Sequence, residues 1–383
     1  MSDISIWSFP TRLLFGVGAV RQTGAEARRA GGSRALIVTD PGVVAAGLLT
    51  PVQSALRSAE IPFEVFSKVD PNPVEKNVHD GVAAFRAAKA DIIVAVGGGS
   101  PLDVGKLIRL KARPGAHERP LVEYDDAIGG DAHITGNVPP LLTLPTTAGT
   151  GSEVGRSGVV MLDVNHRKTV IFSPHLMPTA AILDPELTKS MPARVTAATG
   201  FDALTHCLEA YVAVGDHPLA DAIAFGGLRL CARHLRRAVS HPNDLEARGG
   251  MMKAAMMGAI AFQKGLGACH SLAHPLSSEC DLHHGLANAL CLPAVIRFNS
   301  DVAGERLAEI AVVFGAPPSA AGLADNLSEL RADIGLPSGL GAAGVVREKL
   351  GLLADKATED ACHRCNPRPC TREDLLALYA ASF

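Results

Sequence analysis

The stretch that decides the fold of this chain is Asp91-Ile-Ile-Val-Ala-Val96-Gly97-Gly-Gly-Ser100-Pro-Leu-Asp103-Val-Gly-Lys106. Its β-branched residues predict a strand over 91–96, and Pro101 suits the first turn of a following helix. Three glycines between them carry no Cβ, so backbone N–H groups can approach an anion closely, which a plain strand–helix connection would not need. A strand, a glycine turn and a helix N-terminus in this order predict a pyrophosphate site.

Further short apolar runs extend this pattern on both sides. Ala35-Leu-Ile-Val-Thr39, Leu141-Leu-Thr-Leu144 and Ala180-Ala-Ile-Leu183 predict strands, and spacers of helix length separate them. After residue 188 the β-branched runs fade, and Ala, Leu, Met and His favour helices. We therefore expect a parallel-sheet, Rossmann-like α/β domain over residues 1–186 and an all-helical domain over 187–383.

Polar residues follow two of the predicted strands. Asp40 ends the first strand, where a carboxylate can accept hydrogen bonds from adenine-ribose hydroxyls and repel a 2′-phosphate, or can simply open an Asp-Pro-Gly turn. The loop Pro145-Thr146-Thr147-Ala-Gly-Thr150-Gly-Ser152-Glu153 belongs in the ligand crevice of an open α/β sheet. Upstream, Gly16-Val-Gly18 resembles the dinucleotide fingerprint only loosely, and we interpret it as a turn after a short edge strand.

The second half of the chain concentrates imidazoles around one carboxylate. Two pairs are spaced four residues apart, which places both side chains of a pair on one face of a helix. Imidazoles and a carboxylate suit Zn or Fe(II), usually for Lewis-acid chemistry. The residues of this region are Asp202, His206, His270, His274, His283 and His284.

Composition excludes several classes of protein. A formal net charge of −3 gives no hint of a nucleic-acid or membrane-surface partner, and the short apolar runs argue against a membrane span. The first residues show no signal peptide. Eight cysteines without a disulfide spacing favour a reducing compartment, so we expect a cytoplasmic protein. Cys362-His-Arg-Cys365 with Cys370 has the spacing of a structural-zinc or redox module, but no second C-x-x-C pair completes a zinc site.

Together these segments resemble the iron-containing (group III) alcohol dehydrogenase family, over nearly the whole chain. Several motifs in one order carry the resemblance: Gly97-Gly-Gly-Ser-Pro-Leu-Asp103-Val-Gly-Lys106, Pro145-Thr-Thr-Ala-Gly-Thr-Gly-Ser-Glu153, Leu183-Asp-Pro-Glu-Leu-Thr188, Thr199-Gly-Phe-Asp202-Ala-Leu-Thr-His206, His270-Ser-Leu-Ala-His274-Pro-Leu, His284-Gly-Leu-Ala-Asn288 and Asn366-Pro-Arg368.

The resemblance implies a separate role for each group of site residues. It implies an Fe(II) cofactor, with Zn in some members, and His274 as the proton-relay residue. His283 stands where the family more often has proline, and the spacing from His270 favours His284 as the ligand. The implied metal ligands are Asp202, His206, His270 and His284. The implied NAD contacts are Asp40, Asn72, Gly97, Gly98, Gly99, Ser100, Asp103, Thr146, Thr147 and Lys168.

The expected reaction is reversible hydride transfer between a primary alcohol and NAD, in a homodimer or higher homo-oligomer. By the resemblance, Arg156 occupies a place where many relatives carry a small or neutral residue, so its guanidinium can pair with a substrate carboxylate or form a surface or interdomain salt bridge. The segments 261–267 and 282–285 resemble 4-hydroxybutyrate dehydrogenases, which favours an ω-hydroxy acid. The alternatives are a short-chain alcohol, diol or glycerol-type dehydrogenase and, more remotely, a metal-dependent hydrolase or a structural-zinc protein.

Overall fold

The computed structural model describes residues 9, 11–164 and 168–383, which form two compact units. Of the described residues, the α/β unit takes in those of 11–147 and 151–190, and the helical unit takes in 9, 148–150 and 191–383. The short segment 148–150 belongs to the helical unit because it packs there: a Cβ on Gly149 would lie 2.7 Å from Cβ of Thr199. A boundary after residue 186 stays a prediction.

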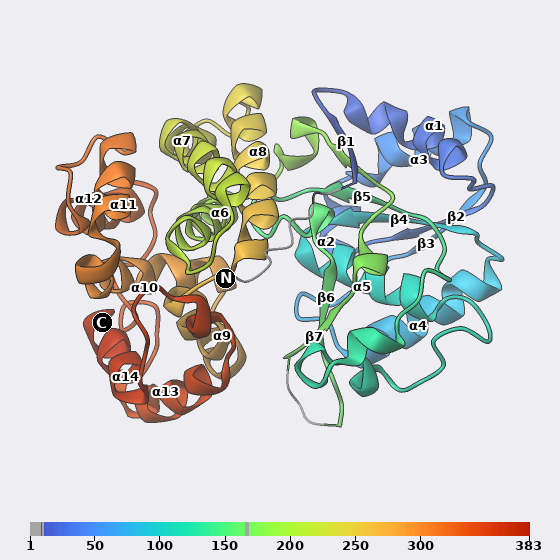
Figure 1. Cartoon of the computed structure of the whole chain (residues 1–383). Coiled ribbons are helices and arrows are strands. Elements are labelled where there is room, and N and C mark those ends of the chain that lie inside the picture. Colours follow the sequence, from blue (N-terminus) through green and yellow to red (C-terminus); the bar gives the residue numbers. More distant parts are fainter. Residues whose placement is uncertain (1–8, 10, 165–167) are drawn as a thin grey trace. The chain divides into compact units, whose positions relative to one another are not determined.

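Six parallel strands form the sheet of the α/β unit, in the order β1–β8–β5–β4–β2–β3 (Figure 1). The parallel sheet expected from the sequence is confirmed, and the short strand expected before Gly16 lies at one edge. A sheet of this kind is buried on both faces, which is why its strands are continuous apolar runs. The strands are β1 (Arg12–Phe15), β2 (Ala35–Val38), β3 (Phe63–Phe66), β4 (Ile92–Gly97), β5 (Leu141–Pro145) and β8 (Ala180–Leu183).

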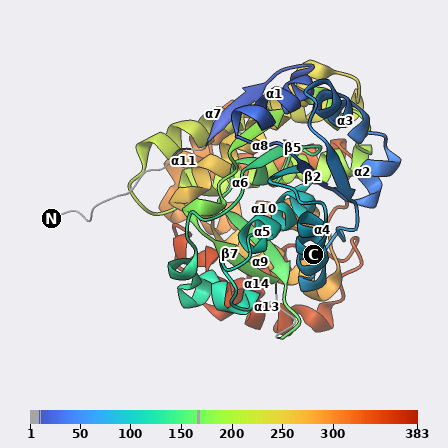
Figure 2. The same cartoon turned by 90° about the vertical axis from the view of Figure 1, so that its right-hand side faces the viewer.

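Helices cover both faces of the sheet (Figures 1 and 2). Successive side chains of a strand point to opposite faces, so Ile92 and Val94 pack with helices α1 and α3, whereas Ile93 and Ala95 pack with α4 and α5. The sheet is thus held between two apolar layers. The helices are α1 (Thr23–Arg29), α2 (Pro41–Ala45), α3 (Leu49–Ser58), α4 (Glu75–Ala87) and α5 (Gly99–Lys111).

A second, two-stranded sheet was not expected from the sequence. β6 (Ser157–Met161) pairs with β7 (Lys168–Phe172) in antiparallel register, and β6 packs against α5. Residues 165–167, which separate the two strands in the sequence, lie outside the described ranges. Buried and partly exposed positions alternate along both strands, as in a hairpin that buries one face.

The helical unit is built around α6 (Ala193–Val212), most of whose residues are buried and which contacts α7, α8 and α10. The described residues 191–383 contain no strand, so the all-helical expectation is confirmed. None of the described helices has the length and apolar character to cross a bilayer. The other helices are α7 (Pro218–Ser240), α8 (Leu245–Ala261), α9 (Ala268–Cys280), α10 (His284–Phe298), α11 (Ser300–Val313), α12 (Ala320–Asp333), α13 (Leu350–Glu359) and α14 (Arg372–Ala381).

Candidate metal centre and cofactor edge

The four residues predicted as metal ligands meet inside the helical unit. Asp202 and His206 come from α6, His270 from α9, and His284 is the first residue of α10. Oδ1 of Asp202 lies 3.4, 3.9 and 4.0 Å from Nε2 of His284, His206 and His270. Donors bound at about 2.1 Å around one tetrahedral ion stand about 3.4 Å apart. The spacing of this donor set therefore fits a single metal ion.

Glycines let the helices that carry these ligands come close together. A Cβ on Gly285, next to His284, would collide with the backbone oxygen of Ala198 on α6. A Cβ on Gly258 of α8 would lie 2.9 Å from Cβ of His206. A side chain at Gly285 would push α10, which carries His284, away from α6, and a side chain at Gly258 would press on the Cβ of His206.

Burial and charge favour the protonation states that bind a cation. Burial lowers the pKa of His206 to about 4, and burial also holds the pKa of His284 well below its usual value. Burial would raise the pKa of Asp202, but the adjacent imidazoles and the Asn288 amide lower it. Neutral imidazoles and an ionised carboxylate are the forms that ligate metals.

Glu209 was not singled out from the sequence, although it orients one ligand. Its Oε2 lies 2.5 Å from Nδ1 of His270, and its Oε1 accepts from the Cys269 backbone N–H at 2.6 Å. Burial opposes protonation of His270, but Glu209 raises its pKa. Because Nδ1 is held by the carboxylate, Nε2 points to the metal site. The sequence does contain a pattern that could have identified Glu209, because Asp202, His206 and Glu209 follow the i, i+4, i+7 spacing of one helix face.

Two asparagines support the same cluster. The Nδ2 amide of Asn288, one turn after His284, donates to Oδ1 of Asp202 at 2.9 Å. Oδ1 of Asn366 accepts from the backbone N–H of Ala268 at 3.2 Å, at the start of α9. The Asn366-Pro-Arg368 motif of the tail thus anchors the helix that carries His270.

The remaining histidines of this region lie outside the four-residue group. His274, one turn beyond His270, stacks on the ring of His284 with centroids 5.2 Å apart and planes at 14°. His283 precedes α10 and is exposed. His274 instead groups with Asp360 and Cys362, and among the described residues Cys365 and Cys370 join no potential metal-binding group.

The predicted cofactor residues of the α/β unit gather at the carboxyl ends of the strands. From β2 the chain continues to β3 on one side, and from β4 it continues to β5 on the other. The carboxyl ends of β2 and β4 therefore flank a topological switch point, the place where open α/β sheets bind ligands. Asp40 follows β2, and Gly97, Gly98, Gly99 and Ser100 end β4 and begin α5.

The glycine turn has the geometry of an anion cradle. Gly97 has φ +153°, and a Cβ there would lie 2.5 Å from Cγ of Pro101. Gly98 precedes α5, so the N–H groups of the first turn are available to a ligand. Ser100 Oγ donates to the Pro71 carbonyl at 2.7 Å, which ties the loop containing Asn72 to the turn.

Asp40 opens the turn into α2 beside the glycine turn, and its contact with the adenine ribose stays a prediction. Its Oδ1 accepts from the Val43 N–H at 2.9 Å and so caps α2, while its Oδ2 lies 3.3 Å from the position of a Cβ on Gly97. Thr146 donates its backbone N–H to the Gly97 carbonyl at 2.9 Å, and the Thr147 side chain lies 3.4 Å from the position of a Cβ on Gly98. These side chains surround the turn.

Asp103 and Lys168 have different surroundings. Asp103 Oδ1 accepts from Ser152 Oγ at 2.6 Å and from the buried Lys106 ammonium at 3.4 Å, and its Oδ2 accepts from Val159 N at 3.2 Å. The carboxylate therefore fixes the loop and strand after β5. Lys168 begins β7. For both residues a contact with the cofactor stays a prediction.

Comparison with known proteins identifies the family. The family model for iron-containing alcohol dehydrogenases matches residues 10–185, and the model for the C-terminal part of Fe-containing alcohol dehydrogenases matches 196–383. This chain belongs to the iron-containing alcohol dehydrogenase family. It is accordingly an alcohol oxidoreductase, and the family assignment made from the sequence motifs is confirmed.

Individual relatives of this family member align along almost their whole length. The 4-hydroxybutyrate dehydrogenase of Cupriavidus necator is 41% identical, over 97% of this chain and 98% of the relative. The NAD-dependent methanol dehydrogenase of Bacillus methanolicus is 37% identical, over 96% of each chain. A crystal structure of a 1,3-propanediol oxidoreductase superposes with a TM-score of 0.93 at 38% identity, covering 99% of this chain and all of that one.

Arg156, the predicted substrate residue of this family member, lies just before β6. Its guanidinium carbon lies 5.1 Å from the centroid of the Phe172 ring, and burial lowers its pKa somewhat. No carboxylate of the described residues forms an ion pair with it, and the choice between a substrate contact and a surface or interdomain salt bridge stays a prediction. A cation stacked on an aromatic ring keeps its N–H groups available to an anion.

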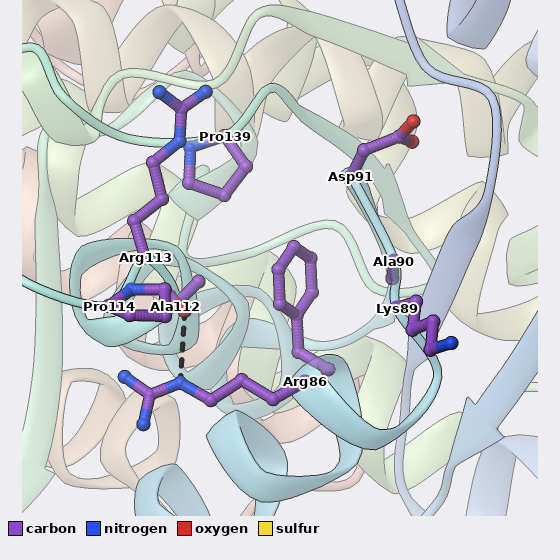
Figure 3. A pocket seen from close by; sticks show the side chains of 9 residues that line it. Arg86, Lys89, Ala90, Asp91, Ala112, Arg113, Pro114 and Pro139 are labelled. Carbon is purple, nitrogen blue, oxygen red and sulfur yellow. Dashed lines mark hydrogen bonds between the residues drawn. The ribbon is translucent and has the colours of Figure 1, made fainter.

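A surface pocket of about 410 Å³ lies at the opposite end of β4 from the glycine turn (Figure 3). Asp91, directly before β4, lines it, as do Lys89 after α4 and Arg113 after α5. Arg86 closes one side by donating to the Ala112 carbonyl at 3.1 Å. The pocket is at the amino-terminal end of β4 and contains none of the predicted site residues, so it is not the candidate site for the reaction.

Proposed function

We propose that this protein interconverts a primary alcohol and its aldehyde with NAD as the hydride carrier and Fe(II), or Zn, as the metal. The single observation that carries the proposal is the buried donor set of Asp202, His206, His270 and His284. Three buried imidazoles and one buried carboxylate at ion-binding separations are the donor set expected around a divalent cation. Family membership supports Fe(II) as the ion.

The metal and the surrounding side chains have separate roles. When bound at this site, a divalent cation supplies Lewis acidity that polarises an alcohol or carbonyl oxygen. Glu209 holds His270 in the tautomer that presents Nε2 to the site. His274 is proposed as the catalytic residue that accepts the proton released on alcohol oxidation and passes it to solvent.

The proposal of NAD rests on the glycine turn at the switch point. The N–H groups at the start of α5 suit a pyrophosphate, and NAD when bound accepts the hydride. Asp40 beside the turn disfavours the 2′-phosphate of NADP through charge repulsion. The NAD-dependent methanol dehydrogenase among the relatives supports the same choice.

For the substrate, we propose an ω-hydroxy acid such as 4-hydroxybutyrate. The Cupriavidus relative bears that name, and Arg156 offers a guanidinium without a carboxylate partner among the described residues. A bidentate pair between Arg156 and a substrate carboxylate would give preference over uncharged alcohols. The similar 1,3-propanediol oxidoreductase makes a short diol the second candidate.

Metal removal tests the reaction class. We expect chelation to abolish NAD-linked alcohol oxidation and anaerobic addition of Fe(II) to restore it, because the cation polarises the reacting oxygen. Metal analysis should find one ion per chain in wild type and none in His270→Ala. Full NADH production by protein shown to be metal-free would refute the proposal, and equal rates with NAD and NADP would refute the role of Asp40.

Arg156→Ala tests the substrate. We expect kcat/KM for 4-hydroxybutyrate to fall about 10- to 100-fold, the effect of losing a hydrogen bond to a charged group. The rate with 1-butanol, which has no carboxylate, serves as the internal control and should hardly change. Equal losses on both substrates would refute a carboxylate role, and a wild-type preference for 1,3-propanediol would favour the diol.

We further propose that the chain acts in the cytoplasm as a homodimer or higher homo-oligomer. The reduced cysteines and the family membership support this proposal, since all eight cysteines are free. Sedimentation of the purified protein would measure the oligomeric state, and a purely monomeric species at micromolar concentration would contradict it.

A further inference from the structure

Asp360, directly after α13, collects hydrogen bonds from the helix and loop beside the metal site. Its Oδ2 lies 2.7 Å from Nδ1 of His274. Its Oδ1 accepts from Ser271 Oγ at 2.7 Å and from the Cys362 backbone N–H at 2.8 Å. Both oxygens of the carboxylate are therefore engaged, and one of them is engaged by the proposed relay histidine.

The carboxylate is held in its ionised form. The Asp360 side chain is 19% exposed. Burial alone would raise its pKa, but hydrogen bonds from His274, Ser271 and Cys362 lower it well below the usual range. An ionised carboxylate can only accept hydrogen bonds. The 2.7 Å contact is therefore a hydrogen bond that Nδ1–H of His274 donates to Oδ2 of Asp360, and in this tautomer Nε2 keeps a lone pair.

The ring of His274 is also placed by the metal-site histidines. It stacks on His284 and meets His270 edge-on, with centroids 6.0 Å apart and planes at 64°. Asp360 thus holds one nitrogen of a ring that packs against two predicted ligands. Fixing one nitrogen of an imidazole determines what the other can do.

We propose that Asp360 is a positioning residue, which holds His274 as the Nδ1–H tautomer so that Nε2 can exchange the proton of the alcohol. This inference rests on the proposed function, in which His274 carries that proton. On oxidation the alcohol loses a hydride to NAD and its hydroxyl proton to Nε2, and the proton then passes to water. The Nδ1–H bond to Asp360 remains throughout and stabilises the transient imidazolium.

A second cation site is the competing explanation, because His274, Asp360 and Cys362 offer ligand atoms within 4.8 Å of one another. The separation of 2.7 Å between Nδ1 and Oδ2 is a hydrogen-bond length. Two donors on one ion would stand about 3.4 Å apart. Burial and the adjacent Asp360 raise the pKa of the Cys362 thiol well above its usual value, so the thiolate that binds metals is disfavoured.

The test is a double-mutant cycle between Asp360→Asn and His274→Ala. An amide in place of the carboxylate can donate to Nδ1 and favour the wrong tautomer. We expect kcat for alcohol oxidation to fall by about 10²- to 10³-fold in Asp360→Asn, with KM and bound metal close to wild type. Because Asp360 acts through His274, adding Asp360→Asn to His274→Ala should cost little more. Asp360→Glu, which keeps the charge, should recover part of the activity.

Asp355→Asn is the matched control, since Asp355 lies on α13 with a half-exposed side chain and pairs with Arg372. If Asp360→Asn does not fold, the cycle is run with Asp360→Glu, which should change kcat only when His274 is present. Unchanged kcat in Asp360→Asn, or a full further loss in the His274→Ala background, would overturn the inference. So would a second metal ion per chain that Cys362→Ser removes. Full activity of His274→Ala would instead refute the relay assigned under the proposed function.

Discussion

Glu209 shows how much depends on one carboxylate that binds neither metal nor substrate in the proposed mechanism. It is 2% exposed, and its two oxygens hold the Cys269 N–H and Nδ1 of His270. The first contact fixes the start of α9, and the second fixes the tautomer of a ligand. Carboxylates that orient a ligating histidine raise its basicity and its affinity for the ion.

Glu209→Gln should therefore weaken metal binding without removing a ligand. We expect the affinity for Fe(II) or Zn to fall about 10- to 100-fold, measured by competition with a chelator. Glu305→Gln, on the exposed face of α11, is the control and should bind metal like wild type. An unchanged affinity in Glu209→Gln would mean that His270 does not need this carboxylate.

The predicted metal ligands could be recognised in the sequence more readily than the residues that hold them in place. Asp202, His206 and His270 stand in recognisable motifs because the chemistry of a ligand restricts the residue type. Glu209 looks like any helix carboxylate until α9 packs over it. The sequence shows the helical spacing of Glu209 from Asp202 and His206. It does not show that a segment distant in sequence buries Glu209.

Among the elements, the close approach of α6 and α10 determines where His284 lies. Gly285 has no room for a side chain, because Ala198 and Asp202 of α6 lie against it. The glycine is thus a condition for the geometry of the metal site. Gly285 lies in the first turn of α10, where a side chain would collide with Ala198, so the glycine meets a packing requirement.

Gly285→Ala should push α10 away from α6. We expect a loss of about 1–3 kcal/mol in stability, typical of overpacking, together with weaker metal binding because His284 moves. Thermal unfolding and metal analysis would measure the two effects. Gly304→Ala on α11 is the control, since nothing lies within 4 Å of a Cβ there, and it should be neutral or slightly stabilising.

The strands that could be predicted are those whose own residues form a continuous apolar run. The strand before the glycine turn is buried on both faces, and its sequence is an apolar run rich in β-branched residues. β3 and the β6–β7 hairpin were not expected, because their positions are partly exposed and do not form a continuous buried run. Their pairing depends on partners that only the folded α/β unit supplies.

The stability of the whole molecule should depend on pH through Glu153. It is 3% exposed, and burial raises its pKa from 4.5 to about 7. Between these values the folded chain binds more protons than the unfolded chain, so the free energy of unfolding decreases as pH rises. Above about pH 7 the remaining cost is that of a buried charge, which Lys106 offsets only in part.

Glu153→Gln should remove this dependence. We expect the variant to be more stable than wild type near pH 8, by up to roughly 3 kcal/mol, and to differ little below about pH 4.5. Thermal unfolding midpoints at several pH values would measure this, with Glu64→Gln on exposed β3 as the control. A wild-type advantage that grows towards alkaline pH would contradict the raised pKa.

The tripeptide 148–150 has a consequence for protein engineering. It follows the Thr146-Thr147 loop of the α/β unit, yet it belongs to the helical unit, where Gly149 packs on Thr199. A chimera that joins two relatives at a single crossover between residues 150 and 191 would separate this tripeptide from its packing partners. Recombination within the family should therefore transfer residues 148–150 together with the helical half.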